Sequence, residues 1–73
     1  MEFPSRKQVE RIKETYPGGT RVRLTKWNDT VTELPIGLKG TVDKVDDIGT
    51  VHVIWDNGFR LGVIIGEDGI EKC

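Results

Sequence analysis

The stretch that decides the fold is Gly49–Leu61, which reads GTVHVIWDNGFRL. Val51, Val53 and Trp55 occupy every second position, the period that lets a β-strand turn one face to a core. An Asp-Asn-Gly turn at 56–58 follows, and Asn and Gly tolerate the positive φ of tight hairpins. The stretch therefore predicts a β-hairpin with Trp55 in the core.

Further strands are predicted on both sides of this hairpin, joined by glycine-containing corners. The predicted strands are Thr20–Thr25, Thr41–Val45, Thr50–Asp56, Phe59–Val63 and Ile70–Lys72. In the first of them Val22 and Leu24 should face the core and Arg21 and Arg23 the solvent. Residues 27–35 predict a polar loop. Five short strands about ten residues apart are typical of a small β-barrel.

A helix is predicted ahead of the strands, over residues 5–15. Ser5 and Gln8 match a capping box, in which each side chain accepts a backbone N–H of the first turn. Val9 and Ile12 share one helical face and should dock on the sheet. The expected organisation is one small α+β, mostly β domain, with an N-terminal helix in residues 1–16 and a barrel in residues 17–73.

The composition of the 73 residues limits the function classes. The net charge is −1 and the pI is near 5.7, which argues against a dedicated polyanion binder. Residues 1–44 carry +3 and residues 45–73 carry −4, so a polarised surface is expected. A single cysteine, Cys73, allows no internal disulfide, and no apolar run approaches the length of a membrane span. These features favour a cytoplasmic protein.

Four motifs give the chain a resemblance to a known family. They are YPGGTRVRL at Tyr16–Leu24, GLKGTV at Gly37–Val42, VDDIGTVHVIWDNG at Val45–Gly58 and GED at Gly66–Asp68. Together they resemble an uncharacterised family of small bacterial and phage domains that recur in mobile elements. More distantly, Val53–Gly58 is similar to the degron-binding modules of Mind-bomb ubiquitin ligases and to ribosomal and transcription-factor domains. The resemblance implies an SH3-like five-stranded barrel and no established activity.

Catalytic and metal-binding chemistry finds little support in the sequence. The one histidine, His52, lies at an outward strand position, where we expect it to be solvated. Asp46 and Asp47 are adjacent and serve better as turn formers than as a facing carboxylate pair. No ligand spacing typical of zinc or calcium is present. We expect no catalytic residue, cofactor or metal, with a small hydrolase or metal-dependent enzyme as the weakest alternative.

The function class that the sequence favours is a non-enzymatic interaction module for a protein or peptide. Trp27 lies in the polar loop, and Trp is enriched among interface anchors, although packing over a barrel mouth would also explain it. The expected contact surface consists of Trp27, Arg21, Arg23, Arg60 and the rim residues Asp56 and Asn57.

Nucleic-acid binding through the basic first strand is the alternative partner class. Arg21, Arg23 and Lys26 project from that strand, and other strands could add Lys39, Lys44 and Arg60. Such cations could contact phosphates while Trp27 stacks on a base. Charged outward residues also keep a strand soluble, so this pattern is not specific. The sequence leaves the oligomeric state open.

Overall fold

The computed structural model describes residues 5–28 and 31–73. Residues 1–4 of the predicted N-terminal segment and residues 29–30 of the predicted loop lie outside the described residues. The elements are α1 (Arg6–Thr15), β1 (Arg21–Lys26), β2 (Lys39–Val45), β3 (Thr50–Trp55), β4 (Arg60–Ile64) and β5 (Gly69–Lys72). The predicted helix and all five predicted strands are confirmed, with ends that differ by one or two residues.

Helix α1 begins at the predicted capping box. The Ser5 hydroxyl accepts the Gln8 backbone N–H at 3.2 Å, and the Gln8 side chain accepts the Ser5 N–H at 2.8 Å. Val9 is buried, and Ile12 and Tyr16 pack against the core of the sheet. At ten residues, this helix of the described chain is too short to cross a lipid bilayer. The helix depends on its apolar face for stability, because a peptide of this length is marginal alone.

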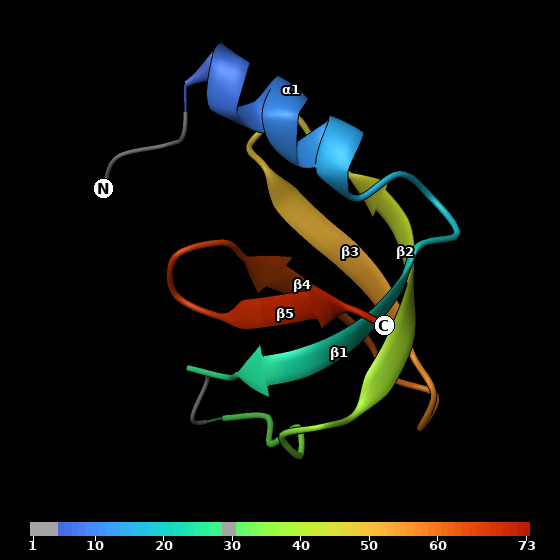
Figure 1. Cartoon of the computed structure of the whole chain (residues 1–73). Helices are drawn as coiled ribbons and strands as arrows, with labels where there is room; N and C mark the ends of the chain where they lie inside the picture. Colours follow the sequence, from blue (N-terminus) through green and yellow to red (C-terminus); the bar gives the residue numbers. More distant parts are fainter. Residues whose placement is uncertain (1–4, 29–30) are drawn as a thin grey trace.

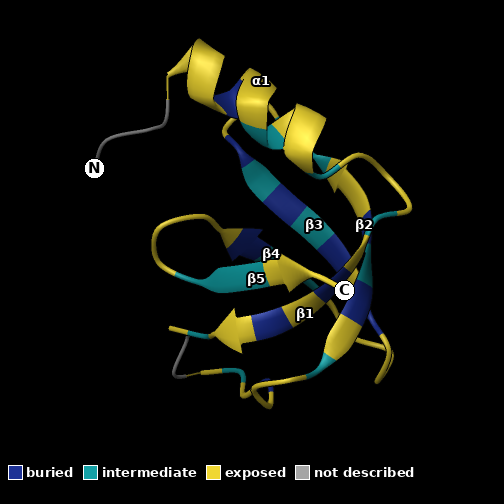
Figure 2. Ribbon diagram, in the orientation of Figure 1, coloured by how far each residue is buried: buried dark blue, intermediate teal, exposed yellow. Residues whose placement is uncertain are grey.

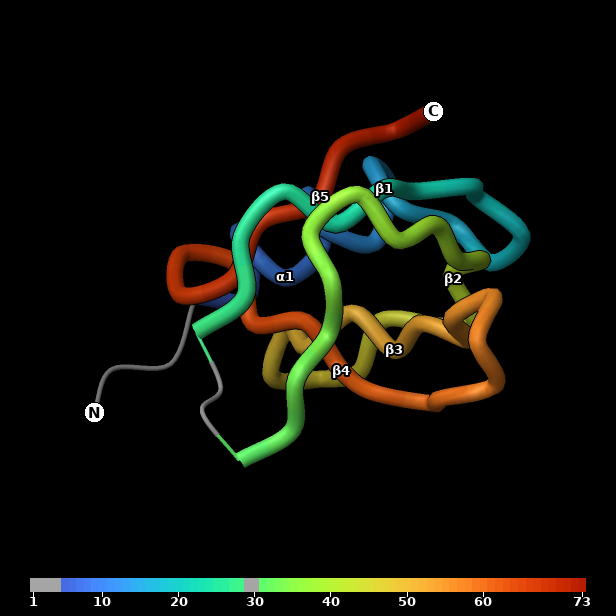
Figure 3. The backbone as a smooth tube through the Cα atoms, turned by 90° about the horizontal axis from the view of Figure 1, so that it is seen from below, coloured from blue at the N-terminus to red at the C-terminus, as the bar shows by residue number. Residues whose placement is uncertain are grey.

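The five strands form one antiparallel sheet in the order β4-β3-β2-β1-β5 (Figure 1). The sheet is strongly bent. Seen from below, β1 and β5 lie on one side of the molecule and β3 and β4 on the other, with α1 across the space between them (Figure 3). The two end strands, β4 and β5, lie near each other but form no ladder, and the connection between them contains an isolated parallel bridge between Ile65 and Asp68. The predicted closed barrel is thus present as a curved sheet that is not closed by strand pairing among the described residues.

The core lies inside the curve of the sheet, as the dark-blue segments of Figure 2 show. Its buried side chains are Val22, Leu24, Leu34, Val42, Val51, Val53, Trp55 and Val63. Trp55 is 1% exposed and donates its Nε1–H to the Leu61 carbonyl at 3.2 Å, so its predicted core position is confirmed. The expectation of a wholly polar loop was wrong at Leu34, which folds back from the β1–β2 connection into the core.

The turn between β3 and β4 follows from its Asp-Asn-Gly sequence. Gly58 adopts φ +95°, and its N–H bonds the Trp55 carbonyl at 2.9 Å. The Trp55 N–H bonds the Phe59 carbonyl at 2.8 Å, which makes a three-residue loop with a glycine bulge. Asn57 accepts the Phe59 N–H through its Oδ1 atom. The predicted hairpin is confirmed, and Asn57 acts as a turn former.

Candidate functional site

The face of the sheet opposite the core, here called the outer face, carries three of the six predicted contact residues, Arg21, Arg23 and Arg60. The strand register aligns Arg21 of β1, Thr41 of β2, Ile54 of β3 and Arg60 of β4 in one row. Arg21 and Arg60 therefore stand at opposite ends of this row, with two strands between them. The neighbouring residues are close enough across the strands to interact.

The arginines of β1 already have partners within the molecule. Arg21 makes a two-pronged ion pair with Asp56, with N–O distances of 2.8 and 2.7 Å, and a further bond of 3.0 Å to Thr41. The hydrogen bonds from Arg21 lower the pKa of Asp56, and the same contact raises the pKa of Arg21. Arg23 pairs with Glu71 of β5. These contacts tie β1 to its neighbours and leave its arginines less available to a ligand.

Two cations of the outer face are different. Within the described residues, the side chains of Arg60 and Lys44 make no hydrogen bond or ion pair, and both are exposed. Arg60 stands opposite Ile54, and Lys44 stands opposite His52. Arg60 is the one predicted contact residue whose side chain is left without a partner in this part of the chain.

Four exposed apolar side chains lie on or next to the β3–β4 hairpin. Ile54 is 38% exposed, Phe59 48%, Ile64 49% and Ile65 42%. Together with Arg60 they form what we call the hairpin patch. Sequence reasoning missed Ile54, Ile64 and Ile65, although Ile54 and Ile64 occupy positions that alternate with core residues. An isoleucine out of phase with the buried set was the available signal, and exposed apolar clusters mark interaction sites.

His52 is less solvated than expected. Its Nε2 atom lies 2.9 Å from Asp46 Oδ2, while Asp46 Oδ1 accepts the backbone N–H groups of Ile48 and Thr50 at 3.1 and 2.9 Å. Partial burial alone would raise the pKa of Asp46, but these hydrogen bonds outweigh it and hold the pKa below its ordinary value. The β2–β3 turn folds the carboxylate back over the strand, which the sequence spacing did not reveal.

The contacts of Asp46 assign it a structural role. One carboxylate oxygen organises the turn and the other fixes the His52 ring, so the expectation that Asp46 is a turn former is confirmed. His52 remains 41% exposed at its side chain. Among the described residues, no cluster of three or more histidine, cysteine or acidic side chains could hold a metal ion.

Trp27 sits at one end of the bent sheet, partly buried against the core. Its Nε1–H donates to the Thr32 carbonyl at 2.6 Å, so the indole holds the β1–β2 connection in place. This corresponds to the packing interpretation of Trp27. A contact role for its exposed part stays a prediction.

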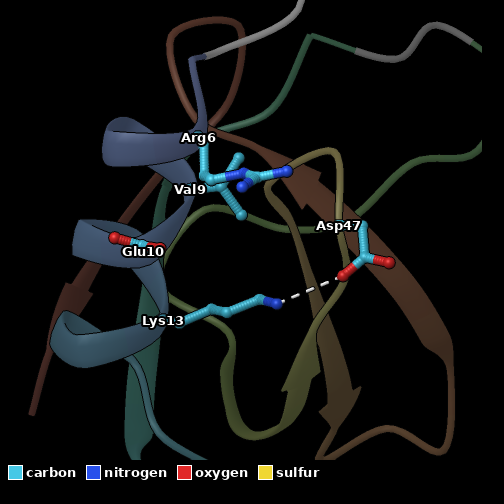
Figure 4. A pocket seen from close by; sticks show the side chains of 5 residues that line it. All are labelled: Arg6, Val9, Glu10, Lys13 and Asp47. Atoms are coloured by element: carbon cyan, nitrogen blue, oxygen red, sulfur yellow. Dashed lines mark hydrogen bonds and ion pairs between the residues drawn. The ribbon is translucent and has the colours of Figure 1, made fainter.

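A shallow groove of about 540 Å³ runs between α1 and the β2–β3 turn (Figure 4). Its lining is Arg6, Val9, Glu10, Lys13 and Asp47. Lys13 Nζ reaches Asp47 Oδ1 at 3.2 Å, and the Asp47 side chain is 99% exposed, so this ion pair is solvent-screened and weak. In Figure 4 Glu10 points away from Asp47. The groove is open to solvent and has a single apolar lining residue, Val9, whereas small-molecule sites are mostly apolar and enclosed.

Fold and surface define a small, mostly β domain with a helix over one end and exposed apolar residues along its β3–β4 hairpin. The chain belongs to a family described as Domain of unknown function (DUF4314), whose sequence model matches residues 5–73. No curated protein matches the chain. The predicted membership of an uncharacterised small-domain family is confirmed.

Proposed function

We propose that this domain is a non-enzymatic interaction module that binds a protein or peptide through the hairpin patch. The observation that carries the proposal is the set of four exposed apolar side chains on and next to this hairpin, with Ile54 directly opposite Arg60, which has no partner among the described residues. A cluster of this kind has no role in the core, and apolar anchors beside an arginine are typical of protein interfaces.

The patch offers enough apolar surface for a modest affinity. Fully burying a large apolar side chain contributes about 1.5–3 kcal/mol. Each of these four side chains is already about half covered, so a partner would gain about 1 kcal/mol from each, before the cost of association. A charge-assisted hydrogen bond from Arg60 to the partner would fix the partner's orientation.

The nucleic-acid alternative is weaker because Arg21 and Arg23 are neutralised by Asp56 and Glu71. Unpaired Lys44 and Arg60 keep it open as an outcome of the test below. Nothing in the geometry of His52 and Asp46 favours an enzyme over a binding domain, since both oxygens of the carboxylate are engaged in holding the turn.

We also infer that the bent sheet belongs to the SH3-like barrel class. Val63 of β4 lies in the core cluster and Ile70 of β5 packs against the same cluster, so both end strands enclose one interior. Nuclear Overhauser contacts between the Val63 and Ile70 methyl groups would support this class, and their absence would contradict it. The resemblance further suggests a bacterial or phage protein of mobile elements, and the single cysteine favours the cytoplasm as its location.

The function is tested by affinity capture with matched surface variants. Tagged wild type, Ile54→Lys and Ile36→Lys are incubated with lysate of the organism that encodes the protein, with and without nuclease. Ile36 is 63% exposed in the β1–β2 connection and serves as the control. We expect a partner protein that survives nuclease, is lost with Ile54→Lys and is kept with Ile36→Lys. The proposal would be contradicted if capture is lost after nuclease treatment, or if Ile54→Lys captures the partner as well as wild type does.

A further inference from the structure

We propose that the partner binds as an added β-strand along the free edge of β4, in antiparallel orientation. The added segment carries an acidic side chain beside Arg60, an aromatic one beside Gly62 and an aliphatic one beside Ile64. This inference rests on the proposed function and adds the binding mode and the chemistry of the partner.

The free edge of β4 follows from the sheet order and the hairpin register. β4 stands at one end of the order β4-β3-β2-β1-β5 and pairs only with β3 among the strands of the described residues. The Trp55 N–H bonds the Phe59 carbonyl, so Phe59, Leu61 and Val63 direct their backbone groups toward β3. Arg60 and Gly62 therefore direct their N–H and C=O groups away from the sheet, ready to pair with another strand.

The other end of the sheet is protected in a way that β4 is not. β5 has four residues and ends with the exposed charged pair Glu71 and Lys72. Short length and charge are common devices against edge-to-edge pairing. β4 has one charged residue, Arg60, and otherwise reads Leu-Gly-Val-Ile. Within the described chain, Arg60 and Gly62 leave their outward backbone groups uncovered beside the exposed Ile54 and Ile64, whereas those of Ile64 are bonded by Glu67 and Asp68. An edge with uncovered backbone groups next to exposed isoleucines is the arrangement used for strand addition to a sheet.

Gly62 determines what the added strand should present at its centre. An added Cβ at this residue would lie 2.6 Å from Thr50 Cγ2 and 4.0 Å from His52 Nδ1. The register places Gly62 opposite His52 and between the rows of Ile54–Arg60 and Thr50–Ile64. Gly62 thus presents no side chain of its own, and the Thr50 methyl leans over it between the exposed Ile54 and Ile64. An aromatic side chain on a neighbouring strand covers such a strand glycine well.

Charge decides which end of the added strand is acidic. Arg60, the first residue of β4, has no hydrogen bond or ion pair to any other described side chain. At the last residue, the Asp68 carboxylate accepts the Ile64 N–H at 3.1 Å, and Glu67 lies in the same connection. A carboxylate on the partner is attracted to the Arg60 end and repelled from the Ile64 end. Antiparallel addition then gives the order aliphatic, aromatic, acidic at alternate positions.

The probe is the acetylated and amidated peptide TVTFTDT, in which threonine fills the positions that face the other side. Titration into ¹⁵N-labelled protein is followed by amide shifts and by hydrogen exchange. We expect the exchange of the Arg60 and Gly62 amides to slow by at least about ten-fold at saturation, because these N–H groups become hydrogen-bonded.

Three controls separate strand addition from other modes. N-methylation of the peptide Phe removes the donor to the Gly62 carbonyl and should abolish binding. N-methylation of the threonine before it blocks an N–H that points away from β4, so this peptide should still bind. Arg60→Glu should weaken TVTFTDT by about five-fold or more and favour TVTFTKT. Lys7→Glu makes the same charge change on an exposed residue of α1 and should have no effect.

The outcomes are distinct. Absence of peptide binding, equal binding of both N-methylated peptides, or unchanged exchange at Gly62 would each overturn strand addition. If capture of a partner still depends on Ile54 in those cases, the proposed interaction function stands and only the binding mode fails. If Ile54→Lys also captures the partner as well as wild type does, the proposed function fails as well.

Discussion

Two glycines in strand interiors give the sharpest test of how the sheet is packed. An added Cβ at Gly40 of β2 would lie 2.6 Å from Val53 Cγ1, 2.9 Å from the Ile54 carbonyl oxygen and 2.9 Å from Trp55 Cε3. Neither Gly40 nor Gly62 has positive φ, so the effect of alanine at either position is steric. At Gly62 the close neighbour is only the Thr50 methyl, at 2.6 Å.

The magnitudes for the two alanine variants differ in a calculable way. At Gly40 the neighbours are backbone and buried side chains, and overpacking of this kind costs about 1–3 kcal/mol. Replacing a strand glycine by alanine returns about 0.5–1 kcal/mol. Gly40→Ala should therefore lower the free energy of unfolding by about 1–2 kcal/mol, and Tm by about 4–8 °C for each kcal/mol.

The same change at Gly62 should be nearly neutral. Turning the half-buried Thr50 side chain relieves the contact at about 0.5–1 kcal/mol, which the gain from alanine offsets. Thr50→Ser deletes the contacting methyl, so the Gly62→Ala/Thr50→Ser double variant should show a positive coupling in a mutant cycle. Urea unfolding followed by tryptophan fluorescence measures all four proteins. A Gly40→Ala variant as stable as wild type would refute the packing of β2 on β3. A Gly62→Ala variant clearly less stable than wild type would refute the described packing of β4 on β3.

Three further predictions concern the core and the turn. Trp55→Ala should cost about 3–5 kcal/mol and leave little folded protein, whereas Trp27→Ala should cost about 1–3 kcal/mol; equal losses in urea unfolding would contradict their different burial. Leu34→Ala should lower the free energy of unfolding by about 2–5 kcal/mol and Ile36→Ala by less than about 0.5 kcal/mol. Similar melting temperatures for the two variants would contradict the assignment of Leu34 as buried and Ile36 as exposed. Because the pKa of Asp46 is lowered in the folded state, its contribution is complete above its ordinary pKa of about 3.9 and is lost as the pH falls through the depressed value. Asp46→Asn should flatten the acid limb of urea midpoints measured between about pH 2 and about pH 7, and an unchanged limb would show that Asp46 is not responsible.

Features governed by neighbouring residues were predictable from the sequence. The hairpin, the inward Val51, Val53 and Trp55, and the capping box of Ser5 each depend on a few consecutive positions. Periodicity and turn chemistry report such local preferences directly. The strand count followed from the same signals.

Features governed by distant residues were not predictable in the same way. Leu34 is one apolar residue in a polar stretch, and its burial depends on where the β1–β2 connection folds back. The pairs Arg21–Asp56 and Arg23–Glu71 join residues 35 and 48 positions apart, so no local spacing reveals them. For the candidate site, Arg60 was identified from the sequence. The exposed apolar residues of the hairpin patch were not, because recognising them requires knowing how far each strand residue is buried.

The strand order has a consequence for how the polypeptide acquires its shape. β1 pairs with β5, with Leu24 opposite Ile70, and the Cys73 N–H bonds the Arg21 carbonyl at 3.2 Å. One edge of β1 therefore stays unpaired until β5, the last strand of the domain, has been synthesised. Pairing of these distant segments is slow because a long loop must close first. Removing the residues after Gly69 would expose the β1 edge and part of the interior together, so intact synthesis through β5 guards the nascent domain against aggregation.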